Sequence, residues 1–188
     1  MKLLNLNSKK IKTYKDSGVD VEKEDEALKR VVEWCSKTFS LRKDVGSPAI
    51  PIAHFAGVVK LSQNLGLAIK TDGVGTKVFI AQLMDKYDTV GIDCVAMNVN
   101  DVICVGAEPI SFVDYLAIQQ PNPKILEEIA IGLVKGAKKA GITIVGGEIA
   151  QLPEMIMGKR EGCGFDLVGM CVGLVQLNKI VTGEKISE

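Results

Sequence analysis

The sequence has few aromatic residues, a single histidine and no excess of charge of either sign. Aromatic residues make up 5% of the 188 residues, whereas apolar residues as a whole reach 47%, so the core must be built from aliphatic side chains. The 23 basic residues cancel the 23 acidic ones. A chain without an excess of basic residues is not drawn electrostatically to nucleic acids or anionic membranes. We therefore expect no nucleic-acid or membrane partner.

Long hydrophobic runs and paired cysteines are missing as well. No apolar run approaches the length of a membrane span, and the N-terminus lacks the continuous apolar segment of a signal peptide. The five cysteines are widely spaced and include no CxxC pair, which argues against a zinc site and a disulfide framework. We expect a cytoplasmic protein with reduced thiols.

Apolar periodicity predicts alternating helices and strands. Helical spacing covers 21–39, 78–85, 89–105 and 122–140, and strand-like runs cover 58–60, 65–71, 109–119, 142–145 and 165–176. Adjacent strands near the start argue against a doubly wound sheet. The predicted fold class is α+β: a mixed α/β sandwich in which helices pack on one face of a mixed sheet.

One segment, TDGVGTK at 71–77, joins a predicted strand to a predicted helix. Unpaired N–H groups at a helix start form an anion site, and glycines let an anion approach the backbone. A carboxylate supplies the hard oxygen that Mg²⁺ prefers. The residues that would hold a phosphate and a hard cation are Asp72, Gly73, Gly75, Thr76 and Lys77. The alternative is a tight turn that only begins a helix.

Several other acidic residues lie in apolar surroundings. In the helix at 89–105, Asp93 and Asp101 share one stripe, with Asn98 beside it. Two like charges on an apolar helix raise each other's pKa unless a cation offsets them, and a bound Mg²⁺ would do so. The alternative is that Asp93 caps a turn and Asp101 pairs with a lysine.

Two further acids are associated with predicted strands. Glu148 follows Gly146-Gly147 after the short strand at 142–145, which places a carboxylate at a strand end where active sites gather. It could also be an exposed turn acid. Asp114 interrupts the strand at 109–119 and is either another ligand or, as we prefer, a residue of the solvent-facing side.

The order and spacing of the motifs resemble one enzyme family. The segments are YKDSGVD at 14–20, TDGVGTK at 71–77, GIDCVAMNVND at 91–101, GAEP at 106–109 and GGE at 146–148. Together they resemble the phosphoribosylformylglycinamidine cyclo-ligases, or aminoimidazole ribonucleotide synthetases. The resemblance implies ATP, Mg²⁺ and ring closure of formylglycinamidine ribonucleotide in purine synthesis.

The resemblance also implies roles for particular residues. Asp72, Asp101 and Glu148 match acidic motifs that serve as catalytic residues and metal ligands. The predicted nucleotide-binding positions are Lys15, Asp16, Gly73, Gly75, Thr76, Lys77, Asp93 and Asn98. Two alternatives remain: another ATP-using enzyme of the wider superfamily, of the selenophosphate synthetase or thiamine phosphate kinase type, or a dimerisation domain without catalysis.

The family pattern further implies a division of the chain. Residues 1–20 would reach the active site, 21–178 would form the ATP-binding N-terminal domain, and 179–188 would begin a linker to a C-terminal domain that the family has. We expect this part to be inactive alone. We also expect a homodimer formed through the sheet.

Overall fold

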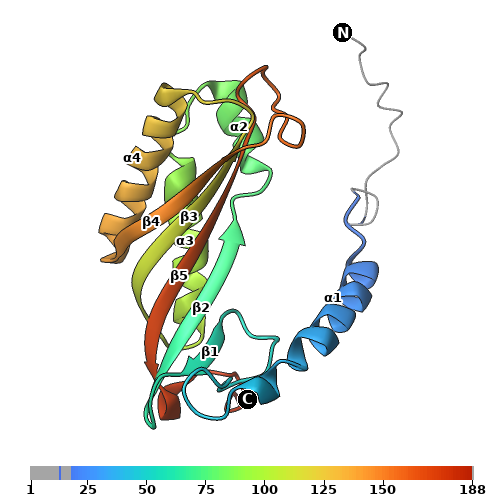
Figure 1. Cartoon of the computed structure of the whole chain (residues 1–188), viewed down its shortest axis with the longest axis vertical. Coiled ribbons are helices and arrows are strands. Elements are labelled where there is room, and N and C mark those ends of the chain that lie inside the picture. Colours follow the sequence, from blue (N-terminus) through green and yellow to red (C-terminus); the bar gives the residue numbers. More distant parts are fainter. Residues whose placement is uncertain (1–12, 14–17, 188) are drawn as a thin grey trace. The chain divides into compact units, whose positions relative to one another are not determined.

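The computed structural model describes Thr13 and residues 18–187, which belong to two compact units (Figure 1). Unit 1, Met1–Leu41, contains the helix α1 (Val21–Ser36) and a 3₁₀ turn at Phe39–Leu41. Unit 2, Arg42–Glu188, contains the sheet and the other helices. α1 ends three residues earlier than its apolar pattern predicted, because the chain turns into the 3₁₀ segment there.

The sheet of unit 2 has five strands in the order β1-β2-β5-β3-β4. The strands are β1 (Gly57–Lys60), β2 (Leu65–Gly73), β3 (Glu108–Ile118), β4 (Thr143–Gln151) and β5 (Phe165–Gln176). All neighbours pair antiparallel except β3 and β4, which are parallel. A parallel pair needs a crossover connection, and the helix α4 (Pro123–Ala140) supplies it.

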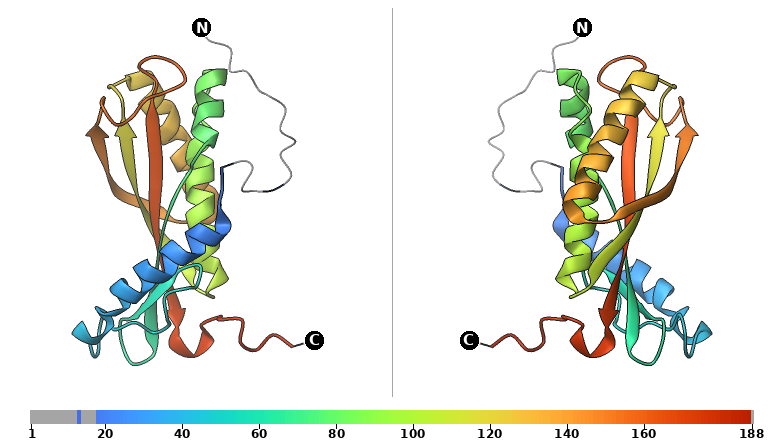
Figure 2. Two further views of the ribbon diagram at one scale, coloured as in Figure 1. Left: turned by 90° about the vertical axis from the view of Figure 1, so that its right-hand side faces the viewer. Right: turned by 90° about the vertical axis from the view of Figure 1, so that its left-hand side faces the viewer.

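The helices of unit 2 pack on one face of this sheet. α3 (Val90–Cys104) contacts β2, β5 and β3, and α4 packs against α3 and β4; Figure 2 shows α3 (green) and α4 (tan) side by side. The short α2 (Lys77–Met84) precedes α3, and a 3₁₀ turn at Leu177–Lys179 follows β5. None of the helices in the described residues has the length and apolar composition of a membrane span.

Alternation along β5 shows which side chains face the helices. The buried positions run from Phe165 through Leu167 and Cys171 to Val175, and the residues between them are less buried. Strand register extends this assignment to the neighbouring strands, because cross-strand partners share a face. The opposite side, called the open face here, has these residues: Leu67, Ile69, Thr71, Val113, Tyr115, Glu148, Val168, Met170, Val172 and Leu174.

The predicted fold class is confirmed: one mixed sheet carries helices on one face. The prediction for β4 was wrong. The strand does not end at Gly146-Gly147 but continues to Gln151, so Glu148 lies inside it. Pairing with β3 supplies backbone hydrogen bonds to this stretch, and tertiary pairing thereby overrides the weak strand preference of glycine.

A bulge in the same strand decides where its side chains face. The register of β3 and β4 shifts between Phe112 and Val113, so Ile144 pairs with Phe112 whereas Gly146 pairs with Val113. One extra residue in a strand moves every later side chain to the other face. Ile144 packs against the core, and Glu148 pairs with Tyr115 on the open face.

Candidate functional site

Asp72 lies near the end of β2, on the face that α3 covers. Its Oδ1 accepts a hydrogen bond from the Gly73 N–H at 2.8 Å, and its carbonyl oxygen accepts one from the Asn98 amide nitrogen at 3.2 Å. Its side chain is 38% exposed. The carboxylate is therefore held by its surroundings and still open to a ligand.

Lys70 connects Asp72 to Asp101. The Lys70 Nζ lies 2.6 Å from Oδ2 of Asp101 on α3 and 3.7 Å from Oδ2 of Asp72. The fold thus brings together two of the predicted metal ligands around one ammonium group. The alternative that Asp101 pairs with a lysine is confirmed.

Lys70 was not among the predicted site residues, because the sequence carries only part of the signal for it. Lys70 and Asp72 are two residues apart in one strand, so their side chains project from the same face. That face meets α3, where a charged residue needs a partner. Once β2 is known to lie under α3, a lysine at this position indicates an acidic partner on the helix.

The loop after β2 presents its glycine to open space. Gly75 has φ +68°, which favours glycine, and no described atom lies within 4 Å of the position that a Cβ would take. Thr76 is the N-cap residue of α2, but its side chain makes no capping hydrogen bond. An anion could therefore approach the start of α2 without displacing a side-chain cap.

Lys77 and Asp93 form an ion pair beside this loop. The Lys77 Nζ lies 3.1 Å from Oδ2 of Asp93, and 3.9 Å from the Met97 sulfur. Both charged side chains are about half exposed, at 50% and 44%. Lys77 is thus directed toward α3 and remains accessible to a ligand.

Asn98 is fully buried between α3 and the sheet. Its amide nitrogen donates to the carbonyl oxygens of Asp72 and Cys94, at 3.2 Å and 2.9 Å. Its Oδ1 has no hydrogen-bond partner among the described residues. Gly169 makes room for this side chain, because a Cβ there would lie 2.7 Å from the Asn98 nitrogen.

Asp114 does not lie on the solvent-facing side, so that prediction was wrong. It pairs with Gly169 on β5, which in turn pairs with Asp72, and the three residues form a row on the helix-covered face. Burial raises the pKa of the Asp114 carboxyl above its usual range. Alternation counted from the strand's apolar residues, Phe112 and Leu116, would have placed Asp114 correctly.

Glu148 is not brought to Asp72 and Asp101. Its Oε1 accepts a hydrogen bond from the neighbouring Ile149 N–H at 2.9 Å, on the open face. Within the described part of the chain, no three His, Cys, Asp or Glu side chains are grouped so that they could hold a metal ion. The three-carboxylate metal site therefore stays a prediction, and so do the catalytic roles.

Two predicted nucleotide-binding residues, Lys15 and Asp16, lie outside the described residues. The five cysteines are all free, as expected. Burial raises the pKa of Cys94 to about 12 and that of Cys171 to about 11. Neither thiol is therefore a ready nucleophile at neutral pH.

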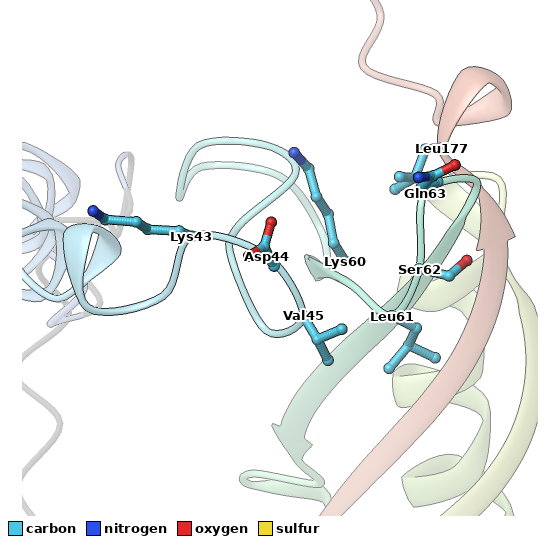
Figure 3. Close-up of a pocket in the computed structure, with 8 residues that line it drawn as sticks. All are labelled: Lys43, Asp44, Val45, Lys60, Leu61, Ser62, Gln63 and Leu177. Atoms are coloured by element: carbon cyan, nitrogen blue, oxygen red, sulfur yellow. The ribbon is translucent and has the colours of Figure 1, made fainter.

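A cavity of about 580 Å³ lies elsewhere in unit 2, and none of the predicted site residues lines it. Figure 3 shows its lining residues: Lys43, Asp44, Val45, Lys60, Leu61, Ser62, Gln63 and Leu177. Ser62 Oγ already accepts hydrogen bonds from the Asn64 and Leu65 N–H groups of its own turn. The Lys43 and Lys60 side chains do not converge on a common point (Figure 3). We assign this cavity no function.

The donors around Asp72 suit a hard cation. Mg²⁺ is usually held by one or two protein carboxylates, with water and phosphate oxygens completing its shell. Asp72 and Asp101 provide two carboxylates that already share a cationic group, and the unpaired Asn98 Oδ1 is a further buried oxygen. These residues fit a divalent cation, and Gly75 with Thr76 fits the phosphate that would accompany it.

Comparison with known proteins gives consistent matches. Residues 54–175 match the family model described as AIR synthase related protein, N-terminal domain. The chain is 51% identical over 175 residues to the phosphoribosylformylglycinamidine cyclo-ligase of Pyrococcus furiosus, covering 93% of this chain and 50% of the relative. It is 48% identical over 179 residues to the enzyme of the same name from Methanosarcina barkeri, covering 95% of this chain and 51% of that relative.

Solved structures share the fold at much lower identity. T. maritima PurL complexed with ATP has a TM-score of 0.58 at 17% identity, covering 78% of this chain and 24% of that one. AaThiL complexed with AMPPCP and TMP has a TM-score of 0.56 at 20% identity, covering 78% and 41%. The sequence matches confirm the resemblance predicted from the motifs. The chain spans about half the length of the curated relatives it matches.

Proposed function

Because the chain belongs to the family of AIR synthase related protein N-terminal domains, we propose that it forms one half of a phosphoribosylformylglycinamidine cyclo-ligase. The reaction is the ATP-dependent closure of formylglycinamidine ribonucleotide to aminoimidazole ribonucleotide. Relatives near 50% identity that carry this name support this reaction over those of the distant structural neighbours. The presence of Asp72, Asp101 and Glu148 argues against a purely structural role.

The observation that carries the proposal is that Asp72 and Asp101 both lie close to the ammonium group of Lys70. We infer that this pair holds Mg²⁺, with Asn98 fixing the end of β2 through its hydrogen bond to Asp72. When bound, Mg²⁺ neutralises phosphate charge and aligns the phosphoryl group. The role of Glu148 as a third ligand stays a prediction.

We further propose that the loop between β2 and α2 receives the phosphates of ATP. The backbone at Gly75 and the first N–H groups of α2 would donate to phosphate oxygens. Lys77 would leave Asp93 to offset the phosphate charge, as its half-exposed side chain allows. Lys15 and Asp16 keep their predicted role on the same nucleotide.

The ring closure then needs positioning and charge neutralisation more than covalent catalysis. The γ-phosphoryl group passes from ATP to the formamide oxygen, and ADP leaves. The amidine-side nitrogen attacks the activated carbon and loses a proton, and the bond from carbon to the phosphorylated oxygen breaks to release phosphate. Because the reaction consumes ATP, we propose that the protein works in the cytoplasm.

We propose residues 21–178 as the ATP-binding domain and 179–188 as the beginning of a linker. We also propose that two copies associate through the open face. Ile69, Tyr115 and Met170 are apolar residues exposed on that face, between 36% and 39%. Apolar patches of this kind mark interaction surfaces.

A chimera tests the proposed reaction. Residues 1–178 are joined to the second half of the Pyrococcus furiosus cyclo-ligase, and ADP release and aminoimidazole formation are followed. We expect ATP-dependent turnover, and we expect Asp101→Asn to reduce it about 100-fold or more, since a lost electrostatic contact to transferring groups has that effect.

Asp44→Asn in the same chimera is the matched control, because Asp44 lines the unassigned cavity. It should leave turnover unchanged. A folded chimera that consumes no ATP would contradict the proposed reaction. Full turnover with Asp101→Asn would instead remove Asp101 from the site.

A further inference from the structure

Lys70 occupies an unusual position for a lysine. It lies on β2, paired with Cys171 of β5 and on the face that α3 covers, and its side chain is only 23% exposed. Its Nζ lies between Oδ2 of Asp101 at 2.6 Å and Oδ2 of Asp72 at 3.7 Å. The Asp101 side chain is 20% exposed, so this pair is largely shielded from water.

The fold requires a cation at this point. β2 and α3 bring two carboxylates to the same ammonium group, and like charges that lie close together repel unless a positive group offsets them. The neighbouring Lys77 pairs with Asp93 instead. Of the ion pairs in the described residues, only those of Lys70 reach Asp72 and Asp101.

Asn98, which contacts the Asp72 backbone, also has an oxygen that lacks a partner among the described residues. Asn98 is 0% exposed, and its nitrogen contacts the Asp72 carbonyl oxygen, but its Oδ1 is without a hydrogen bond among the described residues. A buried polar atom without a protein partner is costly, and a bound water molecule or ion can satisfy it. Carboxylate and amide oxygens are the ligands that a hard divalent cation prefers.

We propose that Lys70 is a tethered counter-ion that holds Asp72 and Asp101 together in the metal-free protein and competes with Mg²⁺ for them. This inference rests on the proposed function, because it takes Asp72 and Asp101 as metal ligands. Mg²⁺ that binds Oδ2 of Asp101 replaces the 2.6 Å pair, and Mg²⁺ at the other oxygen is repelled by the nearby ammonium charge. Lys70 therefore weakens metal binding while it stabilises the empty site.

The test measures binding of Mn²⁺ alone to the 188-residue chain, with free Mn²⁺ counted from its electron paramagnetic resonance signal. Lys70→Met removes the competing charge, and we expect Kd to fall about tenfold, since a nearby unit charge acts on a divalent ion at least this strongly. Lys70→Gln should behave in the same way. Lys70→Arg keeps the charge and should stay within about threefold of the original Kd.

Lys135→Met is the matched control. Lys135 is also paired with an aspartate, Asp88, at 2.9 Å, so this variant removes one charge and one ion pair at a different carboxylate. Its Kd for Mn²⁺ should not change. Thermal melting supplies a second reading: Lys70→Met should melt at a lower temperature without metal and gain more from Mn²⁺, because a tighter ligand stabilises more at a given concentration.

The outcomes separate this inference from the proposed function. Equal or weaker Mn²⁺ binding by both neutral variants would overturn the competition by Lys70. If Asp101→Asn loses Mn²⁺ binding in the same experiment, the assignment of Asp101 as a metal ligand still stands. If neither the original chain nor the neutral variants bind Mn²⁺, the metal ligands are wrong and the inference falls with them. Binding by the neutral variants alone would support it strongly.

Discussion

At the scale of single residues, the site is a set of charges whose partners are fixed by neighbouring elements. Asp101 forms an ion pair with Lys70, and Lys77 forms one with Asp93. Asp72 lies close to Lys70 and accepts a hydrogen bond from the Gly73 N–H group. Because these contacts bridge β2, α2 and α3, their geometry depends on the packing of the fold. A ligand that binds here must exchange existing ion pairs for its own.

Asp114 differs from these acids, because no ion pair to it is found in the described residues and burial raises its pKa. A carboxyl whose folded pKa is raised costs stability when it is charged, and this cost disappears as the pH falls through the folded pKa. We predict that Asp114→Asn stabilises the chain at pH 7. The gain should shrink as the pH is lowered toward the unfolded pKa of about 4.

Urea denaturation at several pH values measures this effect. Asp44→Asn, in the exposed loop before β1, is the control and should give a difference that changes little with pH. A variant at Asp114 that is destabilised at pH 7, or whose difference from the original chain is the same at every pH, would contradict the burial of its charge.

At the scale of elements, close packing of α3 against α4 sets the position of α3 over the sheet. Gly91 on α3 contacts the α4 backbone at Ile129, Gly132 and Leu133, and a Cβ at Gly91 would overlap it. Gly136 similarly faces Val95. These glycines let the helices approach closely, and α3, which carries Asp101 and Asn98, contacts β2 on its other side.

The open face of the sheet is the element from which we expect dimers. Met170 lies on β5 between Thr71 of β2 and Val113 of β3, and is 39% exposed. Lys at this position would place a charge in the middle of the proposed interface without disturbing the helix-covered core. We predict that Met170→Lys converts the dimer to a monomer.

Light scattering after size-exclusion chromatography gives the molar mass. Ile80→Lys on α2 is the matched control, because Ile80 is apolar and 57% exposed but lies on another element. It should leave the dimer intact. If the original chain is a monomer, the proposed interface does not exist. If the dimer survives Met170→Lys, the interface lies elsewhere.

At the scale of the whole molecule, periodicity was enough to predict most of the fold. The helices at 89–105 and 122–140 and the long final strand have strong apolar patterns, and they form close to the predicted bounds. The β4 strand could not be predicted in the same way. Its Gly146-Gly147 pair is typical of a strand end, and only pairing with β3 keeps it extended.

The candidate site was predictable in its residue types but not in its arrangement. The segment 71–77 and the stripe of Asp93 and Asp101 indicated ligands for phosphate and metal. The face on which Glu148 lies depends on a bulge between Ile144 and Gly146, and the local sequence carries no clear sign of that extra residue. Lys70 required knowing that β2 lies under α3, which is a long-range contact.

The central claim is that Asp72 and Asp101 hold the divalent cation of an ATP site. Anomalous diffraction from crystals of the chimera grown with Mn²⁺ and ATP tests it most directly. We predict a Mn²⁺ peak about 2 Å from carboxylate oxygens of both Asp72 and Asp101, with Lys70 displaced from Asp101. A peak that contacts neither carboxylate, or Lys70 still paired with Asp101 beside a bound metal, would contradict the account.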